Sequence, residues 1–177
     1  LNLKYIEVKN VQIYSGREVD FHLSYQNFGQ DINQFPVVVV NHSLTGNSNV
    51  SGQNGWWKDL IGKNKLIDTD RFAVLAFNIP GNCFGKEKNE FVDDLILGDV
   101  AKAFNIAISK LGINRVHSLI GGSVGGGLVW EMGALNPELF ENLIPIAANY
   151  KSSDWLLANT YLQSKLLENS SDPIVDA

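Results

Sequence analysis

The chain has 177 residues, of which 45% are hydrophobic and 19% charged, as is typical of one globular domain with a real core. The formal net charge of −5 and the scattered lysines and arginines argue against a nucleic-acid binder, and no apolar run reaches the roughly 18 residues that span a bilayer. With no signal-peptide pattern at the N-terminus, we expect a cytoplasmic protein with no membrane or nucleic-acid partner.

The first 28 residues alternate apolar and polar side chains, which predicts an antiparallel hairpin. Four short apolar runs follow, each bounded by polar residues, glycine or proline. Such runs are typical of strands that are buried on both faces of a sheet. They lie at residues 36–42, 71–78, 115–121 and 143–147.

Helical spacing of apolar residues separates these runs. It predicts one helix over residues 92–111, ended by Gly112, and a shorter one over 124–135. Strands that alternate with helices predict crossover connections and therefore an α/β fold with a mostly parallel sheet. After the last strand, Ser153 or Asp154 is the expected N-cap of an amphipathic helix.

The sequence Gly121-Gly-Ser-Val-Gly125 fits the pattern G-x-S-x-G. Because a predicted buried strand precedes it and a predicted helix follows, the context indicates a nucleophile elbow, with Ser123 as the nucleophile. The flanking glycines leave room for a sharp turn, and the helix N-terminus offers backbone N–H groups to an oxyanion. A phosphate-binding turn is the alternative, but the sequence has neither G-x-G-x-x-G nor Gly-Lys followed by Ser or Thr.

A serine nucleophile needs a base. Of the three histidines, His22 lies in the predicted hairpin and His117 inside a predicted strand, so we expect both to be structural. His42 ends the strand before the first crossover, where folds of this order supply an oxyanion N–H rather than the base. Since the usual order is serine, acid, histidine, we expect the acid and the base to lie C-terminal to this chain.

The chain's other candidates for chemistry give weak signals. Cys83 is the only cysteine, so no internal disulfide is possible, and no basic neighbour indicates a reactive thiol. The histidines and the cysteine have no recognised ligand spacing, so we expect no metal site. Trp56 and Trp57 could line a site entrance, although core packing of at least one is the favoured interpretation.

Several motifs around the serine occur together, in an order that is more specific than the elbow alone. They are NHSLTGNS (41–48), GWWKDLIG (55–62), IDTDRF (67–72), NIPGNCFG (78–85), LIGGSVGGG (119–127) and LIPIAA (143–148). Over about residues 10–150 the chain resembles the N-terminal half of homoserine O-acetyltransferase, an α/β-hydrolase-fold acyltransferase family of methionine biosynthesis. The resemblance implies that residues 1–150 form the N-terminal part of the hydrolase core. Residues 151–177 would then begin a helical lid, and the C-terminal part of the fold would lie beyond this chain.

The resemblance also implies a ping-pong reaction. A serine takes an acetyl group from acetyl-CoA and passes it to the homoserine hydroxyl, so acetyl-CoA is an acyl-donor substrate and no cofactor is bound. By this match Ser123 is the nucleophile, and the backbone N–H groups of Leu44 and Val124 form the oxyanion hole. The family further implies a homodimer formed through the lid. Because the triad is incomplete here, we expect the chain alone to be inactive.

Two departures from the family pattern leave alternatives open. Val124 stands where the family usually has methionine, and the segment KEKNE (86–90) makes the loop before the long helix shorter. A relative that uses succinyl-CoA, or serine as acceptor, is one alternative, and a serine hydrolase of the same fold is another. A third is a non-catalytic, naturally short chain that pairs with a second subunit or has become a binding module. An isolated half would expose a sheet edge, so we expect it to aggregate or dimerise.

Overall fold

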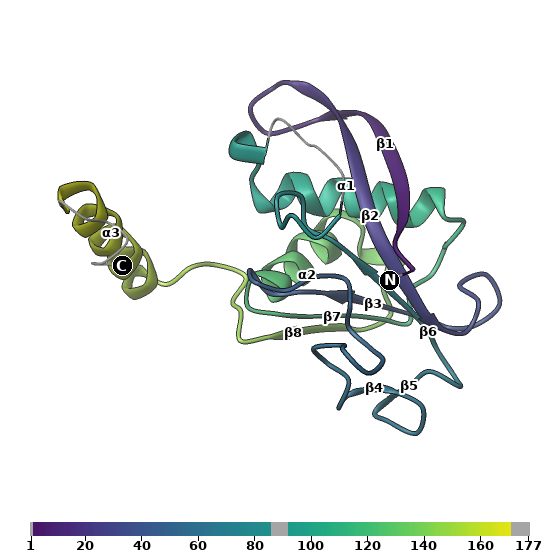
Figure 1. Cartoon of the computed structure of the whole chain (residues 1–177). Coiled ribbons are helices and arrows are strands. Elements are labelled where there is room, and N and C mark those ends of the chain that lie inside the picture. Colours follow the sequence, from purple (N-terminus) through teal and green to yellow (C-terminus); the bar gives the residue numbers. More distant parts are fainter. Residues whose placement is uncertain (1, 86–91, 171–177) are drawn as a thin grey trace.

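The computed structural model describes residues 2–85 and 92–170, so the segment KEKNE lies outside the described residues (Figure 1). Within these ranges, six strands form one sheet in the order β1-β2-β6-β3-β7-β8. Their bounds are β1 Lys4–Gln12, β2 Glu18–Gly29, β3 Val37–Asn41, β6 Ala73–Phe77, β7 Ser118–Gly122 and β8 Leu143–Ile146. The pairs β1–β2 and β2–β6 are antiparallel and the other three are parallel. This confirms the predicted α/β fold with an N-terminal antiparallel hairpin.

Helices α1 and α2 lie together on one side of this sheet (Figure 1). The helical elements of the described residues are α1 Leu97–Lys110, α2 Val124–Leu135, α3 Asp154–Asn169 and the short 3-10 turns η1 Val92–Asp94 and η2 Pro137–Leu139. The bounds of α2 match the prediction, whereas the predicted helix over 92–111 begins five residues late.

The late start of α1 has a local cause. Ile96 is extended, and its N–H donates to the Asp99 carboxylate at 3.1 Å. The other carboxylate oxygen accepts from Tyr14 N at 2.8 Å, which ties the β1–β2 turn to the helix start. The apolar spacing extends back to residue 92, but the helix begins only after Ile96. At that point the Asp99 carboxylate accepts from a backbone N–H that has no partner inside the helix.

The central strands are buried on both faces, as predicted. In β3, Val37 and Val39 pack with α1 and α2, while Val38 and Val40 pack against the segment between β3 and β6. This alternation follows from the two-residue period of a strand. The segment between β3 and β6 contains no helix; it forms a small two-stranded sheet, β4 Ile61–Gly62 and β5 Ile67–Asp68, on the face away from α1 (Figure 1). The sequence analysis did not predict this sheet, because two-residue strands leave no alternation to detect.

The C-terminal side of the described chain is much less covered. The apolar run at residues 143–147 predicts a strand buried on both faces, and this prediction is wrong: the run forms β8 at the edge of the described sheet, where Leu143, Ile144 and Ile146 are 39–42% exposed. Helix α3 stands apart from the sheet at the end of an extended linker (Figure 1), and none of its residues is buried. Ser153 is its N-cap and accepts a hydrogen bond from Leu156 N at 3.2 Å, which settles the choice between the two predicted caps. That α3 begins a lid stays a prediction.

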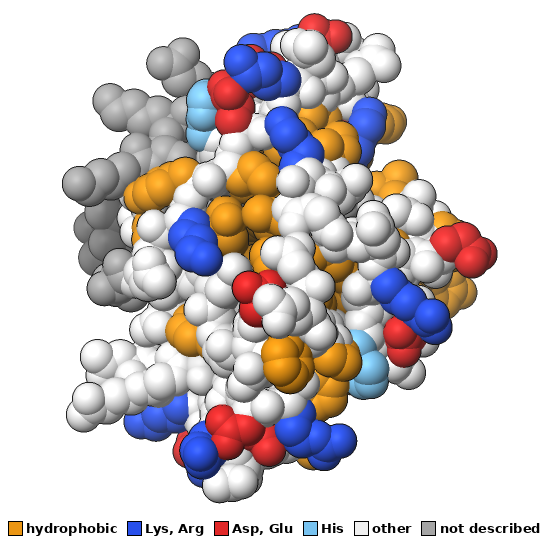
Figure 2. Space-filling model, turned by 90° about the vertical axis from the view of Figure 1, so that its right-hand side faces the viewer, with side chains coloured by type: hydrophobic (Ala, Val, Ile, Leu, Met, Phe, Trp, Pro, Cys, Tyr) orange, Lys and Arg blue, Asp and Glu red, His pale blue; other side chains and the backbone are white. Residues whose placement is uncertain are grey.

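Charged side chains of both signs are scattered over the face shown in Figure 2, without a patch of one sign. Among the helices of residues 2–85 and 92–170, none has the length and apolar character needed to cross a bilayer.

Candidate active site

Ser123 lies in the sharp turn between β7 and α2. Its backbone has φ 55° and ψ −120°, a region that residues with side chains rarely adopt and that costs about 1–3 kcal/mol. Two hydrogen bonds hold the turn: Ser123 N donates to Ile146 O at 2.9 Å, and Gly127 N donates to Ser123 O at 3.0 Å. The residue is exposed, and its hydroxyl does not cap the helix that follows. The turn therefore presents the Ser123 hydroxyl at the carboxyl ends of the parallel strands, with no hydrogen bond to the helix that follows.

Glycines make this turn possible because backbone atoms occupy the space beside them. A Cβ atom on Gly121 would lie 2.2 Å from the carbonyl oxygen of Gly125. A Cβ atom on Gly125 would lie 2.4 Å from Asn41 O and 2.6 Å from His42 O, at the end of β3. The N-terminus of α2 thus packs directly on the segment that leaves β3, and only residues without a side chain allow that approach.

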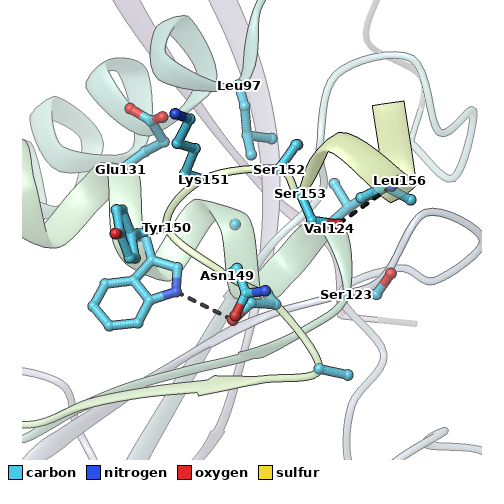
Figure 3. Close-up of a pocket in the computed structure, with 14 residues that line it drawn as sticks. Leu97, Ser123, Val124, Glu131, Asn149, Tyr150, Lys151, Ser152, Ser153 and Leu156 are labelled. Atoms are coloured by element: carbon cyan, nitrogen blue, oxygen red, sulfur yellow. Dashed lines mark hydrogen bonds between the residues drawn. The ribbon is translucent and has the colours of Figure 1, made fainter. Parts of the chain in front are cut away.

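Ser123 borders a pocket of about 620 Å³ (Figure 3). One wall is the start of α2, and the other is the linker from β8 to α3. The lining residues are Leu97, Ser123, Val124, Gly127, Trp130, Glu131, the linker residues 147–153 and Leu156. In Figure 3, Ser123 lies at one end of the pocket and the side chains of Glu131, Tyr150 and Lys151 at the other. The Trp130 indole donates to Ala148 O at 3.4 Å and so ties the linker to α2.

The two predicted oxyanion donors lie on two different segments. Val124 is the first residue of α2 and lines the pocket, and its N–H belongs to the helix end that has no partner inside the helix. Leu44 follows β3, is 74% exposed and does not line the pocket. Within the described residues, neither N–H donates a hydrogen bond. The packing of Gly125 on the end of β3 brings the two segments together, and the oxyanion roles stay predictions.

His42 has no ring nitrogen left for Ser123. The ring is 1% exposed, with Nδ1 2.6 Å from Ser43 O and Nε2 2.9 Å from Ile79 N. Because a carbonyl oxygen only accepts and a backbone N–H only donates, the ring is neutral and carries its proton on Nδ1. Burial also lowers the pKa of His42 below its usual 6.5. Both observations support the interpretation that His42 is not the base.

A buried polar cluster lies behind the loop that follows β3, and the sequence analysis missed it. Asn78 Oδ1 accepts from Ser48 N at 2.7 Å, and Asn78 Nδ2 donates to Ser24 Oγ at 2.8 Å and to Ser48 Oγ at 3.0 Å. The Ser48 hydroxyl donates to Gln26 Oε1 at 2.8 Å, and Asn82 Nδ2 donates to Asn78 Oδ1 at 3.0 Å. Its members come from three distant segments, and no local pattern links them.

The other two histidines lie away from the elbow. His117 directly precedes β7, at the opposite end of that strand from Ser123, and its Nδ1 is 2.9 Å from Ser118 Oγ. His22 lies in β2 opposite Glu7, three strands away from β7 in the sheet. These positions fit the structural roles predicted for both.

The remaining candidates also lie outside the pocket. Trp57 packs on the core beneath the sheet, which confirms core packing for one of the two tryptophans, while the Trp56 indole donates to Asn47 O at 2.8 Å. Cys83 is exposed, with its sulfur 3.5 Å from Gly81 O. In the part of the chain that the structure describes, no group of three or more histidine, cysteine or acidic side chains could hold a metal ion.

Comparisons with known proteins agree with this geometry. The family model described as the alpha/beta hydrolase fold matches residues 36–169. The homoserine O-acetyltransferase of Corynebacterium jeikeium is 32% identical over 149 residues, which cover 78% of this chain and 36% of that protein.

Two solved structures share the fold. A crystallised esterase superposes with a TM-score of 0.82 at 19% identity, over 99% of this chain and 55% of the other. The homoserine O-acetyltransferase of Staphylococcus aureus gives a TM-score of 0.75 at 24% identity, over 96% of this chain and 54% of the other.

The chain thus spans about half or less of the length of these relatives. The family model covers most of the chain, and the fold and the strand–serine–helix order agree with it. The resemblance to homoserine O-acetyltransferases is confirmed, and the chain belongs to the alpha/beta hydrolase fold family.

Proposed function

We propose that this chain is the nucleophile-bearing part of an acyltransferase that moves an acetyl group from acetyl-CoA to the hydroxyl of homoserine. The observation that carries the proposal is the backbone of Ser123, held at positive φ between β7 and α2 with its hydroxyl exposed beside a pocket. The relation to homoserine O-acetyltransferases supports the choice of donor and acceptor.

The first half-reaction acylates the serine. Ser123 Oγ attacks the thioester carbonyl of acetyl-CoA as its proton passes to a base, and the charge that develops on the carbonyl oxygen is met by backbone N–H groups. Val124 N–H and Leu44 N–H are the proposed donors, and loss of one such donor costs about 10²–10³ in rate. The C–S bond then breaks, and the CoA sulfur takes the proton from the base.

The second half-reaction transfers the acetyl group. The homoserine hydroxyl gives its proton to the base and attacks the acyl-serine carbonyl, through an oxyanion at the same two N–H groups. The ester bond to Ser123 breaks and the serine oxygen recovers a proton, which releases O-acetylhomoserine. None of the chain's histidines is placed to be the base: His42 is fully engaged, and His22 and His117 lie elsewhere in the sheet. The base is proposed to lie C-terminal to residue 177.

The test uses the complete gene product that contains this chain. It is incubated with acetyl-CoA, with and without homoserine, and free CoA thiol is measured together with the intact mass. We expect an increase in mass of one acetyl group on Ser123 with acetyl-CoA alone, and CoA release that rises with homoserine. Ser123→Ala should remove both signals. CoA release that does not respond to homoserine would contradict the transferase.

A serine hydrolase is the second candidate, because an exposed serine at this turn serves ester hydrolysis equally well. What separates the two chemistries is whether water reaches the acyl-serine. The same experiment discriminates: a hydrolase releases CoA from acetyl-CoA at a rate that is independent of homoserine, and the acetyl group appears as free acetate rather than as O-acetylhomoserine. A succinyl donor or serine as acceptor is tested by exchanging those reagents in the same assay.

The proposal extends to assembly. Helix α3 exposes large apolar side chains along its length, namely Trp155, Leu156, Leu157, Tyr161, Leu162, Leu166 and Leu167. Exposed apolar surface of this kind marks a protein contact. We propose that α3 begins the lid and contributes to a homodimer, which sedimentation of the complete gene product tests.

A further inference from the structure

The peptide that joins Ser43 to Leu44 is fixed by hydrogen bonds to its carbonyl oxygen. Its carbonyl oxygen accepts from His42 Nδ1 at 2.6 Å and from Gly46 N at 2.9 Å. The described residues contain no cis peptide bond, and in a trans peptide the C=O and the N–H point in opposite directions. Fixing the Ser43 oxygen therefore fixes the direction of Leu44 N–H, which faces away from the His42 ring.

The His42 ring is itself immobilised. Its Nε2 accepts from Ile79 N at 2.9 Å, in the segment that follows β6, and Asn82 Nδ2 lies 3.3 Å from the same atom. A Cβ atom on Gly46 would lie 2.9 Å from His42 Cβ and 3.3 Å from Nδ1, so the loop folds closely around the ring. The ring thus connects the end of β6 to the loop after β3 through one hydrogen bond at each nitrogen.

We propose that His42 is a positioning residue: its Nδ1–H holds the Ser43–Leu44 peptide so that Leu44 N–H is offered to the oxyanion on Ser123 acylation. The inference rests on the proposed function. His42 touches no substrate and transfers no proton in this scheme.

The opposite orientation of this peptide is disfavoured at both ends. Turning it over would point the Ser43 carbonyl where Leu44 N–H now points, so a partial negative charge would face the oxyanion. It would also leave the buried Nδ1–H without an acceptor, which is unfavourable. The two hydrogen bonds to the Ser43 oxygen, from His42 Nδ1 and from Gly46 N, thereby favour a complete oxyanion hole over a repulsive one, and the one from His42 comes from a buried side chain.

Two amide variants separate the two ring nitrogens in the complete gene product. In His42→Asn the side-chain NH₂ can occupy the place of Nδ1, so the bond to Ser43 O is retained. In His42→Gln the amide reaches the place of Nε2 and leaves nothing at Nδ1. Both variants are neutral and polar, so they are matched controls for each other.

The readout is the single-turnover rate of Ser123 acylation, measured with acetyl-CoA and with p-nitrophenyl acetate, alongside urea unfolding of each variant. We expect His42→Gln to lower the acylation rate about 10²-fold, as for the loss of one oxyanion donor, with KM little changed. His42→Asn should stay within about threefold of wild type. Rates that fall in both variants in proportion to lost stability would reduce His42 to a structural role and overturn the inference.

The arms also separate this inference from the proposed function. Wild-type protein that is acylated by neither reagent overturns both, whereas equal acylation of wild type and His42→Gln overturns only the inference. A readout without variants guards against a misfolded protein: NMR of ¹⁵N-histidine-labelled protein should show His42 neutral with the proton on Nδ1. A proton on Nε2 would contradict the proposed hydrogen bond.

Discussion

Two backbone segments meet at the candidate site, and they are held in different ways. The elbow at Ser123 is strained and depends on space: Gly121 and Gly125 leave room where backbone oxygens lie 2.2–2.6 Å from any added Cβ. The loop after β3 depends on directed hydrogen bonds, from the buried His42 ring and from the cluster centred on Asn78. The elbow thus requires residues without a side chain, whereas the loop requires particular polar side chains as hydrogen-bond partners.

This difference determines how each segment can fail. An added methyl group at the elbow collides with backbone that cannot move aside, so the damage is steric. In the loop, a lost polar partner leaves a buried donor or acceptor unsatisfied. Four substitutions or conditions test the comparison, in the complete gene product.

The largest effect is expected from Gly125→Ala, whose Cβ would enter the space of Asn41 O and His42 O. We expect the free energy of unfolding to fall by about 3 kcal/mol, the upper part of the range for overpacking, measured by urea denaturation. Gly122→Ala is the matched control, because nothing lies within 4 Å of its added Cβ. Equal effects at the two glycines would contradict a steric origin.

Next in size is Asn78→Ala, which removes the acceptor for Ser48 N and the donor to Ser24 and Ser48. An unsatisfied buried polar group costs about 1–3 kcal/mol, so we expect a loss of about 2 kcal/mol in the free energy of unfolding. Asn159→Ala, on exposed α3, should change it by less than about 0.5 kcal/mol. A loss of similar size at both positions would show that burial of the cluster is not the cause.

His42 is expected to make the free energy of unfolding depend on pH near neutrality. Its pKa is lowered by burial in the folded state, so the unfolded chain binds more protons as the pH falls through about 6.5. The contribution of His42 to the free energy of unfolding is therefore fully present above that pH. It decreases on acidification by at most about 1.4 kcal/mol per pH unit. Unfolding curves between pH 7.5 and 5.5 measure this slope. His42→Asn should make it shallower, and an unchanged slope in that variant would assign the effect to other groups.

The smallest expected effect is an increase in the free energy of unfolding. Ser123→Gly should raise the free energy of unfolding by about 1 kcal/mol, since glycine tolerates φ 55° without strain. Ser123→Ala removes the same hydroxyl but keeps the strain, so it is expected to leave stability near that of wild type. Thermal unfolding of the two variants side by side tests whether the site stores strain, and identical melting temperatures would show that it does not.

The α/β fold, the N-terminal hairpin and helix 124–135 followed from patterns within short stretches, and the structure confirms them. The start of α1 was wrong by five residues, because the Asp99 carboxylate, which bonds Ile96 and Tyr14, decides it. The small sheet β4–β5 was missed because its strands are too short to alternate.

By itself the sequence determined the elbow, because glycines on either side of a serine, after a buried strand and before a helix, are local information. Only the tertiary structure decided what holds the loop after β3. His42 ends a strand in the sequence like any other histidine, and its role follows from partners at Ser43 and Ile79. Hydrogen-bond direction depends on how β3 and β6 lie side by side, and that arrangement exists only once the sheet has formed.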